Sequence, residues 1–217
     1  MSSPSPVNGN TRVHIGFGRL VAYSALQLPL AMAALPVVLN VAHYYGEVLK
    51  LSLALIGPIL IVSRIIDAIQ DPILGYISDR LTHRKNGRLL LVGSMVPLLI
   101  IGFFMLFDPP AMFHPGADGV SPNPDLLSIW LFVSLVLVHL GYAGVSISYH
   151  ALGAELSDDY NERTRVSVGR EVFGLTGMML AVVLPTWLTS RFGEAAGYQW
   201  LGIIYLPIAI LSVVPDR

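Results

Sequence analysis

The chain has 217 residues, of which 54% are hydrophobic and only 12% charged, whereas a water-soluble domain averages about 25% charged residues. This composition indicates a membrane protein and excludes a large extramembrane catalytic domain, and the absence of cysteine excludes disulfides and Cys-type zinc sites. The formal net charge of −1 and the scattered basic residues argue against a nucleic-acid partner.

Six apolar stretches follow one another along the chain, each long enough to cross a hydrocarbon core of about 30 Å as a helix. They are residues 20–42, 52–78, 89–107, 126–153, 172–189 and 198–214. Helices are expected because lipid leaves backbone amides without partners and because the stretches lack the alternating pattern of barrel strands. The sequence therefore predicts an all-α integral membrane protein, with a tail of residues 1–19 that has no signal-peptide core, a six-helix domain of residues 20–214, and a remainder of residues 215–217.

Lysine and arginine residues are unevenly divided between the two sides of this predicted bundle. Ten of the thirteen lie in the tail, after the second stretch, after the fourth stretch or at the C-terminus. The positive-inside rule predicts that this side, with both termini, is cytoplasmic.

The second stretch carries three ionisable residues at membrane depth. Arg64, Asp67 and Asp71 stand at i, i+3 and i+7, so they fall within about 60° of one another on one helical face. Such residues nearly always face a bundle interior or an aqueous cavity. Two carboxylates against one guanidinium leave a local charge of about −1 that a bound Na⁺, which prefers oxygen ligands, or a proton would neutralise. The alternative is structural, with Arg64 paired to both acids.

The fourth stretch carries a polar stripe. His139, Tyr142, Ser146 and His150 fall at i, i+3, i+7 and i+11, which is again one helical face and suggests a wetted cavity. We interpret His139 as a structural histidine satisfied by a neighbouring helix, and leave His150 open between that role and a solute or proton role. The first, second and fourth stretches are the expected cavity wall, whereas the third and sixth are almost without polar residues and are expected to be peripheral.

Two sequence stretches resemble a known family. SRIIDAIQDPILGYISDR at residues 63–80, preceded by HYYGEVLKLSLALIG at residues 43–57, resembles the melibiose permease-like group of the major facilitator superfamily, the glycoside–pentoside–hexuronide:cation symporters. SYHALGAELSDDYNERTRVSVGREVFGLTG at residues 148–177 is similar to the family's helix 4–5 region. The resemblance implies one half of the major facilitator fold, made of two three-helix inverted repeats.

Site residues are implied by the same resemblance. The helix 2 acids of the family form its cation site, which implies this role for Asp67 and Asp71, with Arg64 as their ion-pair partner. The chain departs from the sugar-transporting pattern, because one sugar-binding aspartate of the family falls at Ala31 and a threonine of the cation site falls at Ala143. The expected substrate-binding residues are Tyr142, Ser146, His150 and Arg170.

The loops on the basic side are similar to the superfamily's gating motif. A carboxylate near a helix end can pair with basic groups there, so these residues are expected to form a latch that breaks and reforms during transport. Topology signals and a solvated loop are the alternatives. The expected gating residues are Gly75, Asp79, Arg80, Arg88, Glu162 and Arg163, joined by Arg84, Lys85, Glu155, Asp158, Asp159 and Arg165.

The expected function is secondary active transport, in which a small polar or amphipathic solute is carried with Na⁺ or H⁺ and no cofactor is needed. Family members have twelve helices in two halves, and this chain resembles the amino-terminal half, with residues 215–217 at the start of the central loop. A second half or a second copy of the chain is therefore an expected partner, beside the lipid bilayer. Two alternatives stay open, a non-transporting membrane subunit and a lipid or lysolipid carrier. An enzyme is not expected, because no nucleophile–base or metal-ligand spacing occurs.

Overall fold

The computed structural model describes residues 16–81, 87–116, 120–155 and 160–213. Within these ranges every regular element is helical, and six spans are long and apolar enough to cross a membrane. The predicted all-α, six-span architecture is therefore confirmed. The elements are α1 (Phe17–Ala25), α2 (Gln27–Leu39), α3 (Val41–His43), a π-helical turn (Tyr44–Val48), α4 (Leu53–Leu81), α5 (Gly87–Phe107), a short 3₁₀ turn (Ala111–Phe113), α6 (Pro124–Glu155), α7 (Tyr160–Phe192) and α8 (Glu194–Val213).

The first span is broken where its sequence cannot sustain a regular ladder. Pro29 has no amide hydrogen for the carbonyl of Ala25, and α1 ends at that residue. Beyond α3 the chain widens into the π-helical turn and then reverses at Lys50, whose φ of 57° is left-handed. The largest boundary error concerns the fifth span, which was predicted to begin at residue 172 but begins at Tyr160, so Arg170 lies well inside α7.

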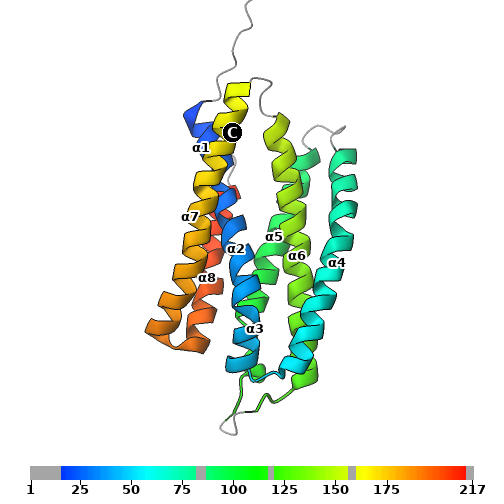
Figure 1. Cartoon of the computed structure of the whole chain (residues 1–217), viewed down its shortest axis with the longest axis vertical. Coiled ribbons are helices and arrows are strands. Elements are labelled where there is room, and N and C mark those ends of the chain that lie inside the picture. The colour runs from blue at the N-terminus through cyan, green and yellow to red at the C-terminus, as the bar shows by residue number, and fades with distance from the viewer. Residues whose placement is uncertain (1–15, 82–86, 117–119, 156–159, 214–217) are drawn as a thin grey trace, which may run out of the picture.

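The six spans alternate in direction, and the first and last described residues lie toward the same end of the bundle (Figure 1). We call this end, where α1 begins and where α4 and α6 end, the basic end, because it carries Arg80, Arg88, Arg163 and Arg165. α5 packs along α6, α2 packs along α7, and α4 packs mainly against α6.

Glycine allows the closest of these helix contacts. A Cβ atom at Gly102 of α5 would lie 2.7 Å from the backbone nitrogen of Val138 in α6, so only hydrogen fits there. Small residues that let two backbones approach closely are the usual means of packing helices in lipid, where no hydrophobic force drives helices together. The indole nitrogen of Trp130 adds a cross-helix bond by donating to the carbonyl of Met105 at 2.8 Å.

An aromatic cluster fills the core toward the opposite end. Tyr44 and Tyr45 are fully buried, Tyr44 packs against Tyr198 with ring centroids 4.7 Å apart, and Tyr45 donates a hydrogen bond to the carbonyl of Leu106 at 3.0 Å. Burial raises the pKa of both Tyr44 and Tyr45, because it disfavours the phenolate. These tyrosines therefore remain neutral and serve packing.

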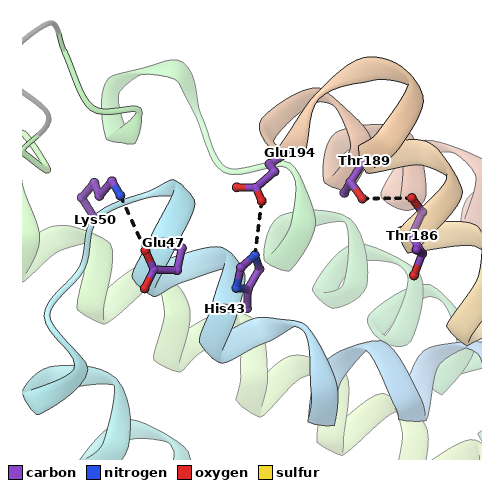
Figure 2. A network of polar contacts seen from close by, with 6 residues as sticks. All are labelled: His43, Glu47, Lys50, Thr186, Thr189 and Glu194. Atoms are coloured by element: carbon purple, nitrogen blue, oxygen red, sulfur yellow. Dashed lines mark hydrogen bonds and ion pairs between the residues drawn. The ribbon is translucent and has the colours of Figure 1, made fainter.

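Surface ion pairs lie beside this cluster. Figure 2 shows His43 facing Glu194 at the start of α8, with 3.6 Å between Nε2 and Oε1, and Lys50 facing Glu47 at 3.7 Å. All four side chains are largely exposed, and such pairs contribute little stability, about 0–1 kcal/mol each.

The helices expected to be peripheral are not the least buried ones. Of the most apolar part of α4, 11% is buried within the chain, against 39% for α5. α4 lies at one edge of the bundle (Figure 1). Within the described chain α5 therefore has less open surface than α4, and the peripheral position of the third span in the membrane stays a prediction. The physical reason is that α5 lies against both α6 and α8, whereas α4 has a single main neighbour.

Candidate functional site

A cavity of about 240 Å³ lies among α2, α4 and α6. These are the first, second and fourth spans, the same three that the sequence predicts as the cavity wall. α2 supplies only small apolar side chains, so the polar groups come from α4 and α6. The lining residues are Ala33, Ala34, Val37, Val38, Arg64, Asp67, Val138, His139 and Tyr142.

Asp67 reaches this cavity because of its position on α4. The residues of α4 buried against its neighbours are Ile56, Ser63, Leu74 and Ser78. At 100° per residue they all point within about 40° of Asp67. Ser78 also marks the α6 side of the helix, since its hydroxyl lies 3.4 Å from that of Ser148. Asp67 is thus turned toward α6 and is partly covered by it.

Arg64 and Asp67 form a loose ion pair. The distance from Nη1 to Oδ2 is 3.7 Å, and the side chains are 53% and 24% exposed. Within the described residues no ion pair joins Arg64 to Asp71, so the alternative in which Arg64 holds both acids is not what the structure contains. An ion pair this long and this exposed is weak, which leaves the carboxylate of Asp67 open to another cation.

Asp71 is placed differently from Asp67. It is exposed and does not line the cavity, and it lies one helical turn nearer the basic end than Asp67. It remains within electrostatic range of both Asp67 and His139. Pro72 follows it inside α4 and has no amide hydrogen, so the carbonyl of Ala68 lacks its helical donor. The carbonyl of Ala68 is thus an oxygen of α4 without its helical hydrogen bond, between Asp67 and Asp71 in the chain.

The expected substrate residues divide into two places. Tyr142 lines the cavity, whereas Ser146 and His150 lie closer to the basic end, with the Ser146 hydroxyl 3.5 Å from Nδ1 of His150. Arg170 of α7 lies over the ring of Tyr149, 5.8 Å from its centroid. The stripe is thus a single helical face, but only its first two members, His139 and Tyr142, border the cavity.

The guanidinium of Arg170 lies over one ring of a tyrosine pair that the sequence analysis missed. Tyr23 of α1 and Tyr149 of α6 stack with centroids 4.6 Å apart, and each hydroxyl donates to the other residue's carbonyl, at 2.6 Å and 3.1 Å. Tyr149 lies off the polar face of its helix and is fully packed, so periodicity gives no sign of it. Only the three-dimensional structure, which brings Tyr23 and Tyr149 together from distant segments, reveals the pair.

The gating residues form local pairs at the basic end. Asp79 lies 3.7 Å from Arg88 across the α4–α5 connection, and Glu162, which is buried, accepts a bond from Arg165 at 2.8 Å. Arg80 and Arg163 are exposed, and Gly75 sits on the open side of α4. Some expected members of the latch lie outside the described residues or have no described side chain: Arg84, Lys85, Glu155, Asp158 and Asp159.

The family follows from this combination of fold and sequence. The model of the MFS/sugar transport protein family matches residues 20–215. The chain therefore belongs to this family of the major facilitator superfamily, among the glycoside–pentoside–hexuronide:cation symporters, and corresponds to their amino-terminal half. The family is one of membrane transporters.

Three relatives illustrate the similarity. The chain is 29% identical to the uncharacterized symporter sll1374 of Synechocystis over 91% of its own length and 35% of the relative. It is 30% identical to the uncharacterized symporter YjmB of Bacillus subtilis over 69% and 31% of the two chains. It is 28% identical to the inner membrane symporter YicJ of Escherichia coli over 82% and 36%. The chain thus spans about a third of the length of the curated relatives it matches.

Proposed function

We propose that the chain is the amino-terminal six-helix unit of a cation-coupled solute symporter of the inner or plasma membrane, with both termini cytoplasmic. The observation that carries this proposal is the cavity lined by Arg64 and Asp67 among membrane-spanning helices, with Asp71 one helical turn away. Charged groups at this depth are costly, so their presence favours a function. The three relatives are named as symporters, which favours this function over a non-transporting scaffold subunit.

Ion coupling is proposed to act through Asp67 and Asp71. With Arg64 the two carboxylates leave a local charge of about −1, which Na⁺ or H⁺ neutralises on binding. The loose 3.7 Å pair between Arg64 and Asp67 supports this role, because a cation has only a weak ion pair to displace. Coupling requires that the ion bind one orientation of the cavity better than the other, since equal binding would shift no equilibrium.

The solute is proposed to be small and polar or amphipathic. Tyr142 would contact it in the cavity, and Ser146, His150 and Arg170 would contact it nearer the basic end. Hydroxyl and imidazole groups along one face of α6, with the guanidinium of Arg170 from α7, supply both donors and acceptors, which suits a hydroxylated solute. At the basic end, the pair of Asp79 and Arg88 is proposed to act as the latch that opens and closes with transport.

A second six-helix unit is proposed to cover the open side of α4, either as the other half of the transporter or as a copy of this chain. Arg64 and Asp71 are exposed on that side. Insertion scales assign about 2.5–3.5 kcal/mol to each charged residue at the centre of a spanning helix. A protein partner or an aqueous cavity between two units avoids that cost, whereas hydrocarbon does not.

Uptake into vesicles containing the complete transporter tests this proposal. Labelled mono- and disaccharides are offered under an imposed Na⁺ gradient and, separately, under a pH gradient. Asp67→Asn and Asp71→Asn keep nearly the same side-chain volume but remove the charge, so ion-driven uptake is expected to be lost while insertion is retained. Asp125→Asn, at the start of α6, is the matched control. Undiminished ion-driven uptake by the Asp67→Asn protein would contradict the assignment.

A further inference from the structure

A second cavity, of about 460 Å³, opens where α5 ends and α6 and α8 begin, at the end of the bundle opposite the basic end. It shares no lining residue with the cavity at Asp67. Its volume lies within the range of about 300–1,000 Å³ that is usual for small-molecule sites. The groups in its wall that can recognise a ligand are two aromatic side chains and two polar ones: Phe104, Trp130, Asp108 and Gln199.

Asp108 places a fixed negative charge in this cavity. Its backbone amide donates to the carbonyl of Phe104 at 2.8 Å, and two prolines with restricted φ follow it. Within the described ranges its carboxylate has no ion pair and no hydrogen bond. The α5–α6 connection, residues 108–123, contains no lysine or arginine, and the carbonyl end of α5 adds negative potential. The cavity therefore favours a cationic group.

The aromatic rings indicate which kind of cation. The indole nitrogen of Trp130 donates to the carbonyl of Met105 at 2.8 Å, and its ring packs on the buried ring of Phe113 with centroids 5.7 Å apart, so this ring is held in place. Phe104 is 36% exposed. Aromatic faces attract organic ammonium groups. An inorganic ion of the Ca²⁺ type needs six or more oxygen ligands, and the described chain gathers no group of three metal-ligating side chains. One carboxylate beside two rings therefore suits an ammonium group better than a metal ion.

An exposed apolar surface continues from the cavity toward the middle of the membrane. Along α8, exposed residues follow Gln199 at 4, 7 and 11 positions, so they lie within about 40° of it around the helix. They are Ile203, Leu206 and Ile210. α5 lies beside this surface, because a Cβ atom at Gly202 would be 3.8 Å from Phe104, and Ile101 of α5 is exposed one turn further in. A ligand with an ammonium head and long apolar chains therefore fits both parts.

We propose that this cavity binds the ammonium headgroup of a zwitterionic phospholipid, from the leaflet at the end opposite the basic end. Asp108 and the rings of Phe104 and Trp130 take the ammonium group, and the amide of Gln199 donates to the phosphate. The acyl chains lie along the exposed surface of α5 and α8. No lysine or arginine lines the cavity, so an anionic headgroup without an ammonium group finds no ionic partner there. The bound lipid contacts the third, fourth and sixth spans together and stabilises their packing.

The experiment measures thermal unfolding of the complete transporter in detergent micelles at pH 8.0, titrated with phospholipids that differ only in the headgroup. Phosphatidylethanolamine and phosphatidylcholine are expected to stabilise the protein with about tenfold higher apparent affinity than phosphatidylglycerol, because the ion pair and the cation–π contacts contribute a few-fold each. Glycerophosphoethanolamine, which has the headgroup without acyl chains, is expected to have no effect at the same concentrations.

Two variants and a control assign the effect to the cavity. Asp108→Asn keeps the side-chain volume but removes the charge, and is expected to lose most of the headgroup preference. Phe104→Leu keeps an apolar contact but removes the ring, and is expected to weaken phosphatidylethanolamine binding about threefold. Asp125→Asn removes an exposed acid at the start of α6 that does not line the cavity, and is expected to behave like the wild type.

Three results overturn the inference, and none of them concerns ion coupling at Asp67. Equal stabilisation of the wild type by all three phospholipids would show that the ammonium group is not recognised. A full headgroup preference in the folded Asp108→Asn protein, or unchanged binding by Phe104→Leu if the first variant does not fold, would place the headgroup elsewhere. Stabilisation by glycerophosphoethanolamine equal to that by the lipid would make the ligand a soluble ammonium compound.

Discussion

Replacing Arg64 with Gln separates a coupling role from a structural one. The guanidinium of Arg64 is the protein's own competitor for Asp67, at 3.7 Å. Coulomb's law gives about 1 kcal/mol for charges at this distance in a dielectric like water and about 4 kcal/mol at an effective dielectric constant of 20. Because more than half of the Arg64 side chain is exposed, the lower figure applies, in agreement with measured exposed pairs. Removing this competitor should tighten Na⁺ binding about fivefold, which is the factor that 1 kcal/mol represents.

The assay is a Na⁺ titration of thermal stability at pH 8.0, with Arg191→Gln at the far end of α7 as the matched control. The control is expected to bind Na⁺ like the wild type. If Arg64 instead holds helices together, Arg64→Gln should lower the unfolding midpoint without Na⁺ and leave the Na⁺ affinity unchanged or weaker. Weaker Na⁺ binding by a well-folded Arg64→Gln protein would refute the reasoning.

Three further predictions concern packing, assembly and topology. Gly102→Val should destabilise the protein by about 1–3 kcal/mol in thermal or denaturant unfolding, because its new atoms meet the backbone of α6, whereas Gly93→Val, with nothing within 4 Å, should change little. A Cβ atom at Gly75 would have nothing within 4 Å, so Gly75→Leu should spare the six-helix unit but reduce cross-linking to a second unit, and unchanged cross-linking would place the partner elsewhere. Reporter fusions after Arg12 should read as cytoplasmic and at Gly116 as external, and a cytoplasmic signal at Gly116 would reverse the orientation.

The number and helical type of the spans could be predicted, because a segment that crosses lipid must satisfy its backbone hydrogen bonds internally, as a helix does. The boundaries could not be predicted equally well. Most of the first twelve residues of α7 are polar or charged, so hydropathy does not distinguish them from a loop, yet the helix runs through them from Tyr160. The break after α1 was foreseeable from Pro29, whereas the π-helical turn at Tyr44–Val48 has no local sequence signal that we recognise.

The site could be predicted only as far as a helical face. Periodicity places Arg64, Asp67 and Asp71 on one side of α4, but which of them is covered depends on where α6 lies against that helix. Asp67 lines the cavity and Asp71 does not, although the two stand one helical turn apart on the same face, so the sequence pattern does not separate them. His139, expected to be satisfied by a neighbouring helix, has no hydrogen-bond partner for either ring nitrogen among the described residues. It was misjudged because whether a neighbouring helix satisfies an imidazole depends on the residues that helix presents.

The helix that carries the charges of the proposed site, α4, is also the least buried helix of the bundle. α4 is held mainly by α6, so its other side can be covered only by something beyond the described chain. That side carries Asp71 and Arg64, while Asp67 lies at its border. A cation at Asp67 therefore changes the net charge of the surface against which a second unit would close. Closing over a neutral surface avoids the desolvation of a net charge, so ion binding favours the closed arrangement. Coupling in this scheme needs no long pathway, because the ion binds at the moving interface itself.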